Sequence, residues 1–215
     1  MKITDVLFDF DGTLVDSAPC ILRCYQLVFQ QLNIQPQIAI TDDIIGPPLM
    51  DTLISLTGIN EQEEINVMAE LFKSFYDEQA ATETLPYPNI LSVLEHLKSE
   101  NINLYIATNK RAVPTMKVID YLGWRDFFIS IRSIDQLEPE RCNKSSLIGD
   151  MLEQHNITVD TAVYIGDKQD DFIAANVNNL PFLAASWGYG NWDPDDNKTL
   201  LALADLMSQV LSING

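Results

Sequence analysis

The hydrophobic residues of this chain follow two patterns, short unbroken runs and longer stretches with helical spacing. The first run, Val6 to Phe8, is apolar throughout, which favours a strand buried on both faces of a parallel sheet. From residue 90 onward the two patterns alternate. They predict strands at 6–8, 102–109, 126–133, 161–167 and 181–186, and helices at 90–100, 113–123, 144–155, 170–179 and 198–211.

Strands that alternate with helices form βαβ units around a parallel sheet. We therefore predict an α/β fold whose core is a Rossmann-like parallel sheet. In such a fold, ligands bind outside the carboxyl ends of the strands. The residues that directly follow the predicted strands are therefore the first candidates for a functional site.

Residues 17–84 interrupt this alternation, because their apolar positions have helical spacing throughout. The helical stretches are "CILRCYQLVFQQL", "LMDTLISLTG" and "EQEEINVMAELFKSFYDEQAA". Two proline-bearing segments, 16–19 and 82–89, flank the region, as expected for connectors between domains. We predict a core domain formed by residues 1–16 and 85–215, with residues 17–84 inserted as an α-helical domain.

Three of the predicted strands end in polar side chains. Asp9 and Asp11 follow the first strand, Thr108 and Asn109 end the second, and Asp167 ends the strand at 161–167. At ~4 Å and an effective dielectric of ~20, two like charges repel by roughly 4 kcal/mol. An Asp-Gly turn explains Asp11 but leaves Asp9 unexplained inside an apolar run. A bound cation is the simplest partner for these acids.

The segment "YIGDKQDD" brings further acids to this edge of the sheet, Asp170 and Asp171. Acids in the first turn of a helix complement its dipole. This effect could explain Asp170 and Asp171 without a metal, but it does not explain Asp167. Carboxylate oxygens without nearby histidine or cysteine are the ligands of a hard cation. The sequence therefore predicts a Mg²⁺ site.

Groups suited to an anion lie beside the predicted acids. A hydroxyl and backbone N–H groups at the turn after Thr108 can hold a phosphate, although threonine and asparagine are also ordinary helix caps. Lys144 opens a predicted helix, where a cation costs ~0.3–1 kcal/mol unless an anion binds there. A solvated lysine is the alternative interpretation.

Composition excludes several classes of function. The chain has 215 residues and a formal net charge of −18, which argues against binding to nucleic acid or to an anionic membrane surface. No apolar stretch approaches the ~20 residues of a membrane span, so we expect a soluble cytoplasmic protein.

The remaining metal-binding residue types lack the spacing of a site. The three cysteines, Cys20, Cys24 and Cys142, do not have zinc-type spacing, and we expect them to be buried for structural reasons. A metal or redox pair is the alternative for Cys20 and Cys24, which lie four residues apart on one face of a predicted helix. Both histidines, His96 and His155, fall in predicted helices and are expected to be structural. The segment "SWGYGN" (186–191) is either loop packing or part of a pocket rim.

Four segments together resemble the motifs of the haloacid dehalogenase superfamily. They are "DFDGTLVDS" (9–17), "ATN" (107–109), Lys144 and "GDKQDD" (166–171), and "IGPPL" (45–49) and "SWGYG" also resemble its phosphoglycolate-phosphatase-like and pyrophosphatase-like branch. This branch has a helical cap, which the resemblance assigns to residues 17–84. Two positions depart from the pattern: Lys144 is not followed by proline, and Asn89 stands where glycine is common.

The resemblance also implies a role for each residue. Asp9 would attack phosphorus, and Asp11 would protonate the leaving oxygen and then activate water. The phosphoryl oxygens would be bound by Thr108, Asn109 and Lys144. The Mg²⁺ ligands would be Asp9, the main-chain carbonyl of Asp11, and Asp167, with Asp171 in support. The expected function is hydrolysis of a small phosphate monoester through an aspartyl-phosphate intermediate, as in phosphoglycolate phosphatase.

Several related functions remain as alternatives. A pyrophosphatase, a 5'-nucleotidase and a non-catalytic phosphate-binding regulatory protein would share these motifs. A dehalogenase has no need of Asp11, and a phosphonatase needs a Schiff-base lysine, for which the helical insert offers Lys73 alone. A sugar-phosphate mutase would want a base there, and residues 17–84 contain no histidine.

The charge of the helical insert bears on the substrate. It holds ten acidic residues against Arg23 and Lys73, which disfavours a polyanionic substrate. We expect a small phosphorylated metabolite as the partner, no nucleic acid or membrane, and a monomer or weak homodimer.

Overall fold

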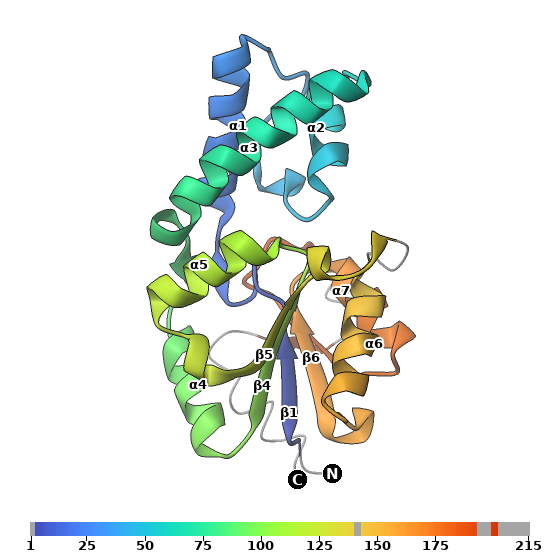
Figure 1. Cartoon of the computed structure of the whole chain (residues 1–215). Helices are drawn as coiled ribbons and strands as arrows, with labels where there is room; N and C mark the ends of the chain where they lie inside the picture. The colour runs from blue at the N-terminus through green and yellow to red at the C-terminus, as the bar shows by residue number, and fades with distance from the viewer. Residues whose placement is uncertain (1–2, 140–142, 193–198, 202–215) are drawn as a thin grey trace. The chain divides into compact units, whose positions relative to one another are not determined.

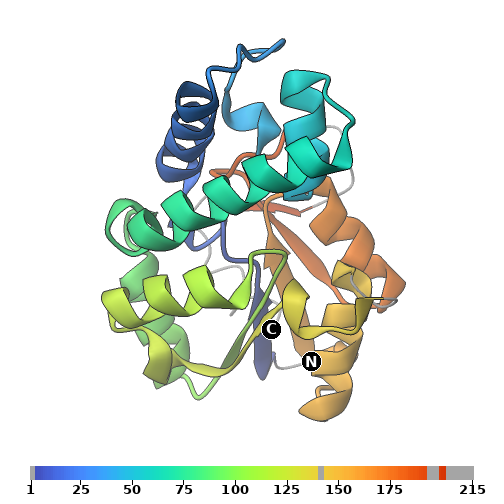
Figure 2. The ribbon, with the colours of Figure 1, turned by 45° about the horizontal axis from the view of Figure 1, so that its top comes forward.

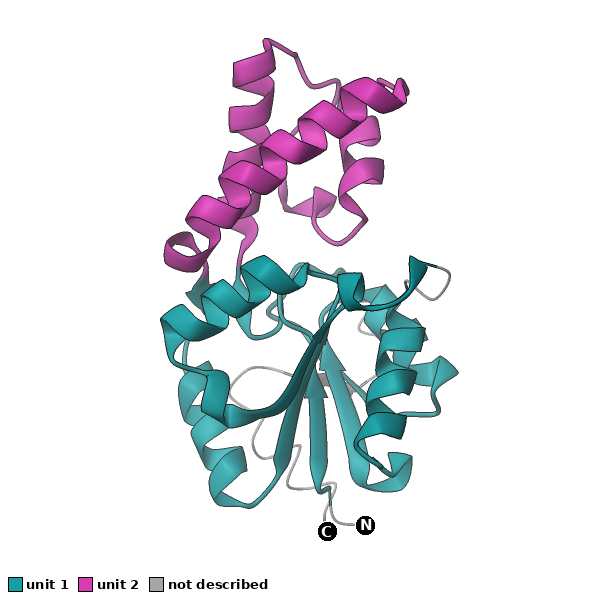
Figure 3. Cartoon of the chain, viewed as in Figure 1, with its two compact units in different colours: residues 1–16, 85–215 teal, residues 17–84 magenta. Residues whose placement is uncertain are grey.

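The computed structural model describes residues 3–139, 143–192 and 199–201. The chain divides into two compact units, one of residues 1–16 and 85–215 and the other of residues 17–84 (Figure 3). Within the described residues, no helix is long and apolar enough to cross a membrane.

The larger unit is built on a parallel sheet with the strand order β5-β4-β1-β6-β7-β8 (Figure 1). Its strands are β1 (Asp5–Phe8), β4 (Asn103–Thr108), β5 (Phe128–Ser133), β6 (Ala162–Gly166), β7 (Phe182–Ala185) and β8 (Thr199–Leu201). Strand β1 pairs in parallel with both β4 and β6, and its four residues are buried. The predicted α/β fold with a parallel sheet is confirmed.

Helices cover both faces of this sheet (Figures 1 and 2). They are α4 (Ile90–Ser99), α5 (Ala112–Leu122), α6 (Lys144–Gln154) and α7 (Gln169–Val177). On one face, Leu147 and Met151 of α6 and Ala174 of α7 form an apolar cluster with Leu7 and Tyr164 of the sheet. These four helices lie where the helical spacing predicts them. Because they pack against the sheet, they hold its strands, and the polar residues at the strand ends, in place.

One element differs from its prediction. Residues 199–201 form strand β8 beside β7, whereas the sequence predicts a helix over 198–211. A short apolar run fits either a strand or a helix. Parallel pairing with β7 supplies hydrogen-bond partners to the backbone groups on one side of β8, which is the last strand of the sheet. The rest of the predicted helix lies outside the described residues, as does Cys142.

The smaller unit contains helices α1 (Ala18–Leu32), α2 (Leu49–Thr57) and α3 (Gln62–Glu83). An aromatic contact joins α1 to α3, with ring centroids of Tyr25 and Phe72 4.5 Å apart. Cys20 and Cys24 are buried in α1 and are not joined by a disulfide. A hydrogen bond with Cys20 and burial both raise the pKa of the Cys24 thiol, which disfavours the reactive thiolate and agrees with a role in packing.

The chain passes between the units through two very short strands that the sequence did not predict. These strands, β2 (Val15–Asp16) and β3 (Leu85–Pro86), form an antiparallel ribbon. Shortly after it, Asn89 adopts a left-handed conformation with φ 66° and ψ 0° at the start of α4. Glycine and asparagine tolerate this conformation best, which explains why asparagine can stand where glycine is common.

Candidate active site

The predicted acids gather at one edge of the sheet because the strands that carry them are parallel neighbours. Asp9 follows β1 and Asp167 follows β6, while Asp171 lies in the first turn of α7. One carboxylate oxygen from each of these three acids lies within 4.8 Å of the others, and all three residues are buried. This cluster, Asp9, Asp167 and Asp171, is called the acidic triad below.

Lys144 is the cation that lies within the acidic triad. Its helix begins here because the side chain of the preceding Asn143 accepts a hydrogen bond from the backbone N–H of Ser146 at 2.9 Å. The ammonium of Lys144 is 2.8 Å from Oδ1 of Asp9 and also bonds to Oδ1 of Asp171. Lys144 is buried, so the alternative of a solvated lysine is wrong.

A second anchor holds Asp171. Its Oδ2 accepts a hydrogen bond from the backbone N–H of Lys168 at 2.9 Å, at the N-terminus of α7. The neighbouring Asp170, by contrast, is exposed. Of the two acids in this turn, Asp171 therefore belongs to the buried site. Asp170 is outside it and is placed to interact with the helix dipole.

Burial makes two acids of the triad, Asp9 and Asp167, costly to ionise. It raises the pKa of Asp9 to about 8, with Asp171 and Asp167 adding to this effect and Lys144 opposing it. Burial and Asp171 likewise raise the pKa of Asp167 to about 7, against the hydrogen bond from Tyr189. For Lys144 the balance is reversed, because Asp171 and Asp9 outweigh burial and raise the pKa of its ammonium. A divalent cation among these oxygens would favour their ionised forms.

The donor set fits a hard divalent cation. Oδ1 of Asp167 is buried and has no hydrogen-bond partner among the residues that the structure describes. An unpaired buried carboxylate oxygen is expensive, and a metal ion is a natural partner for it. The acidic triad can therefore bind a metal.

The segment 186–190, which sequence reasoning left unassigned, surrounds Asp167. The backbone N–H of Tyr189 donates to Oδ2 of Asp167 at 2.8 Å. A Cβ on Gly188 or Gly190 would overlap atoms of Asp167, so both positions require glycine for close approach. Trp187 fixes the loop to the first motif by donating from Nε1 to the carbonyl of Thr13 at 3.0 Å. The two glycines were the signal for this role.

Gly190→Ala should weaken binding of a divalent cation. The added Cβ would overlap the main-chain oxygen of Asp167, so either the loop or Asp167 must move. Outer-shell contacts of this kind are worth roughly 10–100-fold in metal affinity, and calorimetric titration would measure the loss. Gly123→Ala is the control, because a Cβ there meets no atom within 4 Å and only its φ of 69° is strained. Equal metal affinity in both variants would contradict this role for the loop.

The carboxylate of Asp11 is not part of the acidic triad and pairs with a different lysine. Nζ of Lys110 is 2.8 Å from Oδ1 and 3.1 Å from Oδ2 of Asp11. The following Gly12 has a φ of 83°, and a Cβ there would overlap the carboxylate of Asp167, so this turn also requires glycine. Sequence reasoning missed Lys110, although it directly follows the second motif in "ATNK".

The other candidates have different surroundings. Thr108 is buried, and its hydroxyl accepts a hydrogen bond from the backbone N–H of Lys110 at 3.1 Å, while Asn109 is exposed.

His155 packs beside Tyr105, with ring centroids 5.3 Å apart. His96 lies in the last turn of α4. Neither histidine reaches the acidic triad, in agreement with their predicted structural roles.

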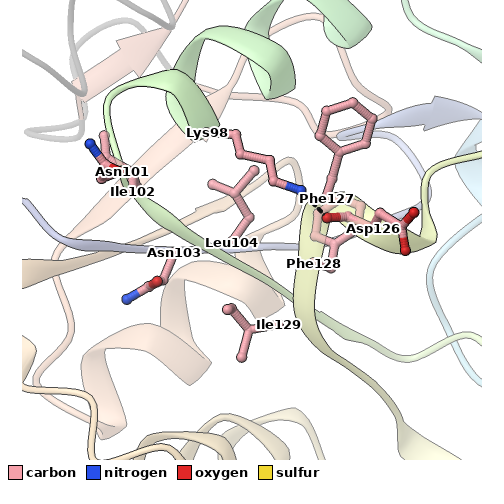
Figure 4. Close-up of a pocket in the computed structure, with 9 residues that line it drawn as sticks. All are labelled: Lys98, Asn101, Ile102, Asn103, Leu104, Asp126, Phe127, Phe128 and Ile129. Carbon is pink, nitrogen blue, oxygen red and sulfur yellow. Dashed lines mark hydrogen bonds between the residues drawn. The ribbon is translucent and has the colours of Figure 1, made fainter.

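A cavity of about 290 Å³ lies at the opposite edge of the sheet, beside the amino ends of β4 and β5 (Figure 4). Its lining includes Asn103, Leu104 and Phe128, and the Lys98 ammonium lies over the ring of Phe127 at 5.4 Å. Lys98 already donates to the carbonyl of Asp126. None of the strand-end acids lines this cavity, so the acidic triad is the stronger candidate.

Comparisons with known proteins show the family of this chain. Residues 6–185 match the haloacid dehalogenase-like hydrolase family. A 5'-nucleotidase of Pseudomonas aeruginosa is 27% identical over 199 residues, which cover 90% of this chain and 87% of that protein. A phosphoglycolate phosphatase of Psychrobacter arcticus is 29% identical over 195 residues, covering 86% and 84%. The crystal structure of a predicted phosphatase from Clostridium acetobutylicum has a TM-score of 0.85 and 26% identity, covering 99% of this chain and 100% of that one. The chain therefore belongs to the haloacid dehalogenase-like hydrolase family.

Proposed function

We propose that this protein is a Mg²⁺-dependent phosphatase that hydrolyses a small phosphate monoester through an aspartyl-phosphate on Asp9. The observation that carries the proposal is the position of Asp9, buried at a strand end with Lys144 2.8 Å away and two further acids beside it. A carboxylate held in this way can form a covalent intermediate, and the surrounding cations can stabilise the charge of a phosphoryl group. The similarity to proteins named phosphoglycolate phosphatase and 5'-nucleotidase supports the same class.

The proposed reaction has two steps. In the first, a carboxylate oxygen of Asp9 forms a bond to phosphorus while the bond to the leaving oxygen breaks, and Asp11 donates the proton that this oxygen takes up. In the second, Asp11 removes a proton from water, the water oxygen bonds to phosphorus, and the bond to Asp9 breaks. Lys144, Thr108 and Asn109 bind the phosphoryl oxygens.

The proposed metal ligands are Asp9, the main-chain carbonyl of Asp11, and Asp167, with Asp171 in support. When bound there, Mg²⁺ supplies positive charge to the phosphoryl oxygens. The side chain of Asp11 contacts Lys110 rather than the triad, which agrees with a main-chain role in metal binding and keeps its carboxylate out of the proposed metal site.

We further propose that residues 1–16 and 85–215 are the catalytic domain and that residues 17–84 are a substrate-selecting cap. The cap has ten acidic and two basic residues, so we expect substrates with little negative charge beyond the phosphoryl group. The ribbon formed by β2 and β3 would act as its hinge. A small phosphorylated metabolite fits these requirements better than a folded phosphoprotein.

The test is a phosphatase assay on the purified protein. With p-nitrophenyl phosphate, chelator should lower the rate by more than about 100-fold, because a bound metal supplies several kcal/mol to this type of reaction. Added Mg²⁺ should restore the rate, and Ca²⁺ should do so poorly because it favours looser coordination. Full activity in chelator would contradict the metal assignment, and no activity with any phosphate ester in Mg²⁺ would contradict the phosphatase itself.

A panel of substrates would separate the remaining candidates. Phosphoglycolate, nucleoside 5'-monophosphates and pyrophosphate should be compared by kcat/KM at equal Mg²⁺. The charge of the cap predicts that pyrophosphate will be the poorest of the three. A 5'-nucleotidase is the second candidate, since a relative of that name is 27% identical over 90% of this chain.

A further inference from the structure

We propose that Lys110 is a positioning residue that holds the carboxylate of Asp11 in the orientation needed for proton transfer. This inference rests on the proposed function and assigns a role to a residue outside the four family motifs. Nζ of Lys110 lies 2.8 Å and 3.1 Å from the two carboxylate oxygens of Asp11. A contact to both oxygens restrains rotation of the carboxylate, which a contact to one oxygen would not.

Lys110 is itself fixed in place. Its side chain is 4% exposed. Its backbone N–H donates to the hydroxyl of Thr108 at 3.1 Å, and its ammonium lies 5.8 Å from the centroid of the fully buried Phe10 ring. A lysine restrained at both backbone and ammonium is a firm support for its partner.

Asp11 needs such a support because of its position. Its side chain is 18% exposed, twice the value for Asp9, and it precedes a glycine turn with a φ of 83°. Lys144 serves Asp9 and Asp171 instead. The site thus has two buried lysines with separate tasks, Lys144 for the phosphoryl group and the triad, and Lys110 for the residue that moves protons.

The two-step reaction gives this role a specific kinetic signature. With p-nitrophenyl phosphate, whose leaving group needs little protonation, formation of the aspartyl-phosphate proceeds without help from Asp11. Its hydrolysis still requires Asp11 to take a proton from water. A poorly positioned Asp11 should therefore slow the second step alone, and the phosphorylated enzyme should accumulate.

The experiment is rapid-quench kinetics on Lys110→Met with p-nitrophenyl phosphate in Mg²⁺. General acid–base catalysis contributes ~10²–10⁴-fold, so kcat should fall by about 100-fold. A burst of about one p-nitrophenolate per enzyme should precede steady turnover, and acid-quenched protein should carry one phosphoryl group by mass spectrometry. With phosphoglycolate, whose alkoxide leaving group needs a proton, the first step should also slow and no burst should appear.

Two variants keep the comparison sharp. Lys110→Arg retains a cation that can contact both carboxylate oxygens, and it should keep at least a tenth of the wild-type kcat without a burst. Lys117→Met removes the same charge from an exposed position on α5 and should behave as wild type. If Lys110→Met does not fold, Lys110→Gln, whose side chain is one atom shorter, keeps a hydrogen-bond donor but no charge and should give the burst.

The outcomes separate the two levels of the proposal. A wild-type protein that releases no phosphate from any ester would refute the proposed function. An active wild type whose Lys110→Met variant shows unchanged kcat, or loses activity without accumulating phosphoenzyme, would refute the role of Lys110 alone. A loss of activity without accumulated phosphoenzyme would mean that Lys110 is structural, because general damage to the site slows formation of the intermediate as well as its hydrolysis.

Discussion

Asp9→Asn is expected to abolish turnover and to leave the fold intact. The amide matches the carboxylate in shape but cannot attack phosphorus, and losing the nucleophile of a covalent catalyst costs roughly 10⁶-fold in kcat. The fold should tolerate the change, because burial raises the pKa of Asp9 to about 8 and a neutral amide avoids that cost of ionisation. Steady-state assays and thermal unfolding would measure both effects.

Asp11→Asn should behave differently, and the contrast tests the assignment of roles. The nucleophile remains, while the group that donates and accepts protons is lost. With an activated ester, intact-protein mass spectrometry after acid quench should show one phosphoryl group on Asp11→Asn and none on Asp9→Asn. A phosphorylated Asp9→Asn protein would show that the nucleophile lies elsewhere.

Lys144→Met should produce the largest loss of stability among substitutions in the site. Lys144 is 7% exposed and contacts both Asp9 and Asp171, so the variant leaves buried acids without their cation. Breaking a buried ion pair from one side costs about 3–5 kcal/mol. Activity should fall by at least ~100-fold as well, since a donor to the phosphoryl oxygens is lost. Denaturant unfolding of wild type and variant, both in chelator, would measure the difference.

This loss should depend on pH in a defined direction. In chelator, the folded protein keeps a proton on Asp9 up to about pH 8 and on Asp167 up to about pH 7, whereas the ordinary pKa is 3.8. The folded state then binds more protons than the unfolded state, so stability should fall as pH rises from about 4 to 8. Without Lys144 the pKa of Asp9 rises further. The deficit of the variant should therefore grow above about pH 7, where the wild type releases these protons and the variant keeps them, and a deficit that shrinks there would contradict the ionic role of Lys144.

The sequence predicted most of the fold because its elements are long enough to show their periodicity. The run Val6 to Phe8 is a buried strand, and the helices from α4 to α7 begin and end close to their predicted bounds. The failures are short elements. Strand β8 was predicted as helix, and the two-residue strands β2 and β3 are too short to carry any periodic signal.

The candidate site was predictable as far as the topology of a parallel sheet determines it. Asp9, Asp167 and Lys144 each sit next to a predicted element, so their convergence follows from strand order. The pairing of Lys110 with Asp11 and the wrapping of residues 186–190 around Asp167 could not be predicted in this way. Both depend on where a loop turns in space, and loop geometry is decided by contacts that are distant in sequence.

The central position of β1 in the sheet has a consequence for how the protein folds during its synthesis on the ribosome. This strand, residues 5–8, obtains its first sheet partner only with residues 103–108 and its second with residues 162–166. At ~5–20 residues per second, this apolar segment waits roughly 8–30 s for its second neighbour after it has been made. The helices of residues 17–84 rely on closer contacts and can form meanwhile. Chaperones that shield nascent hydrophobic chain should therefore engage residues 5–8 until residues 162–166 have been made.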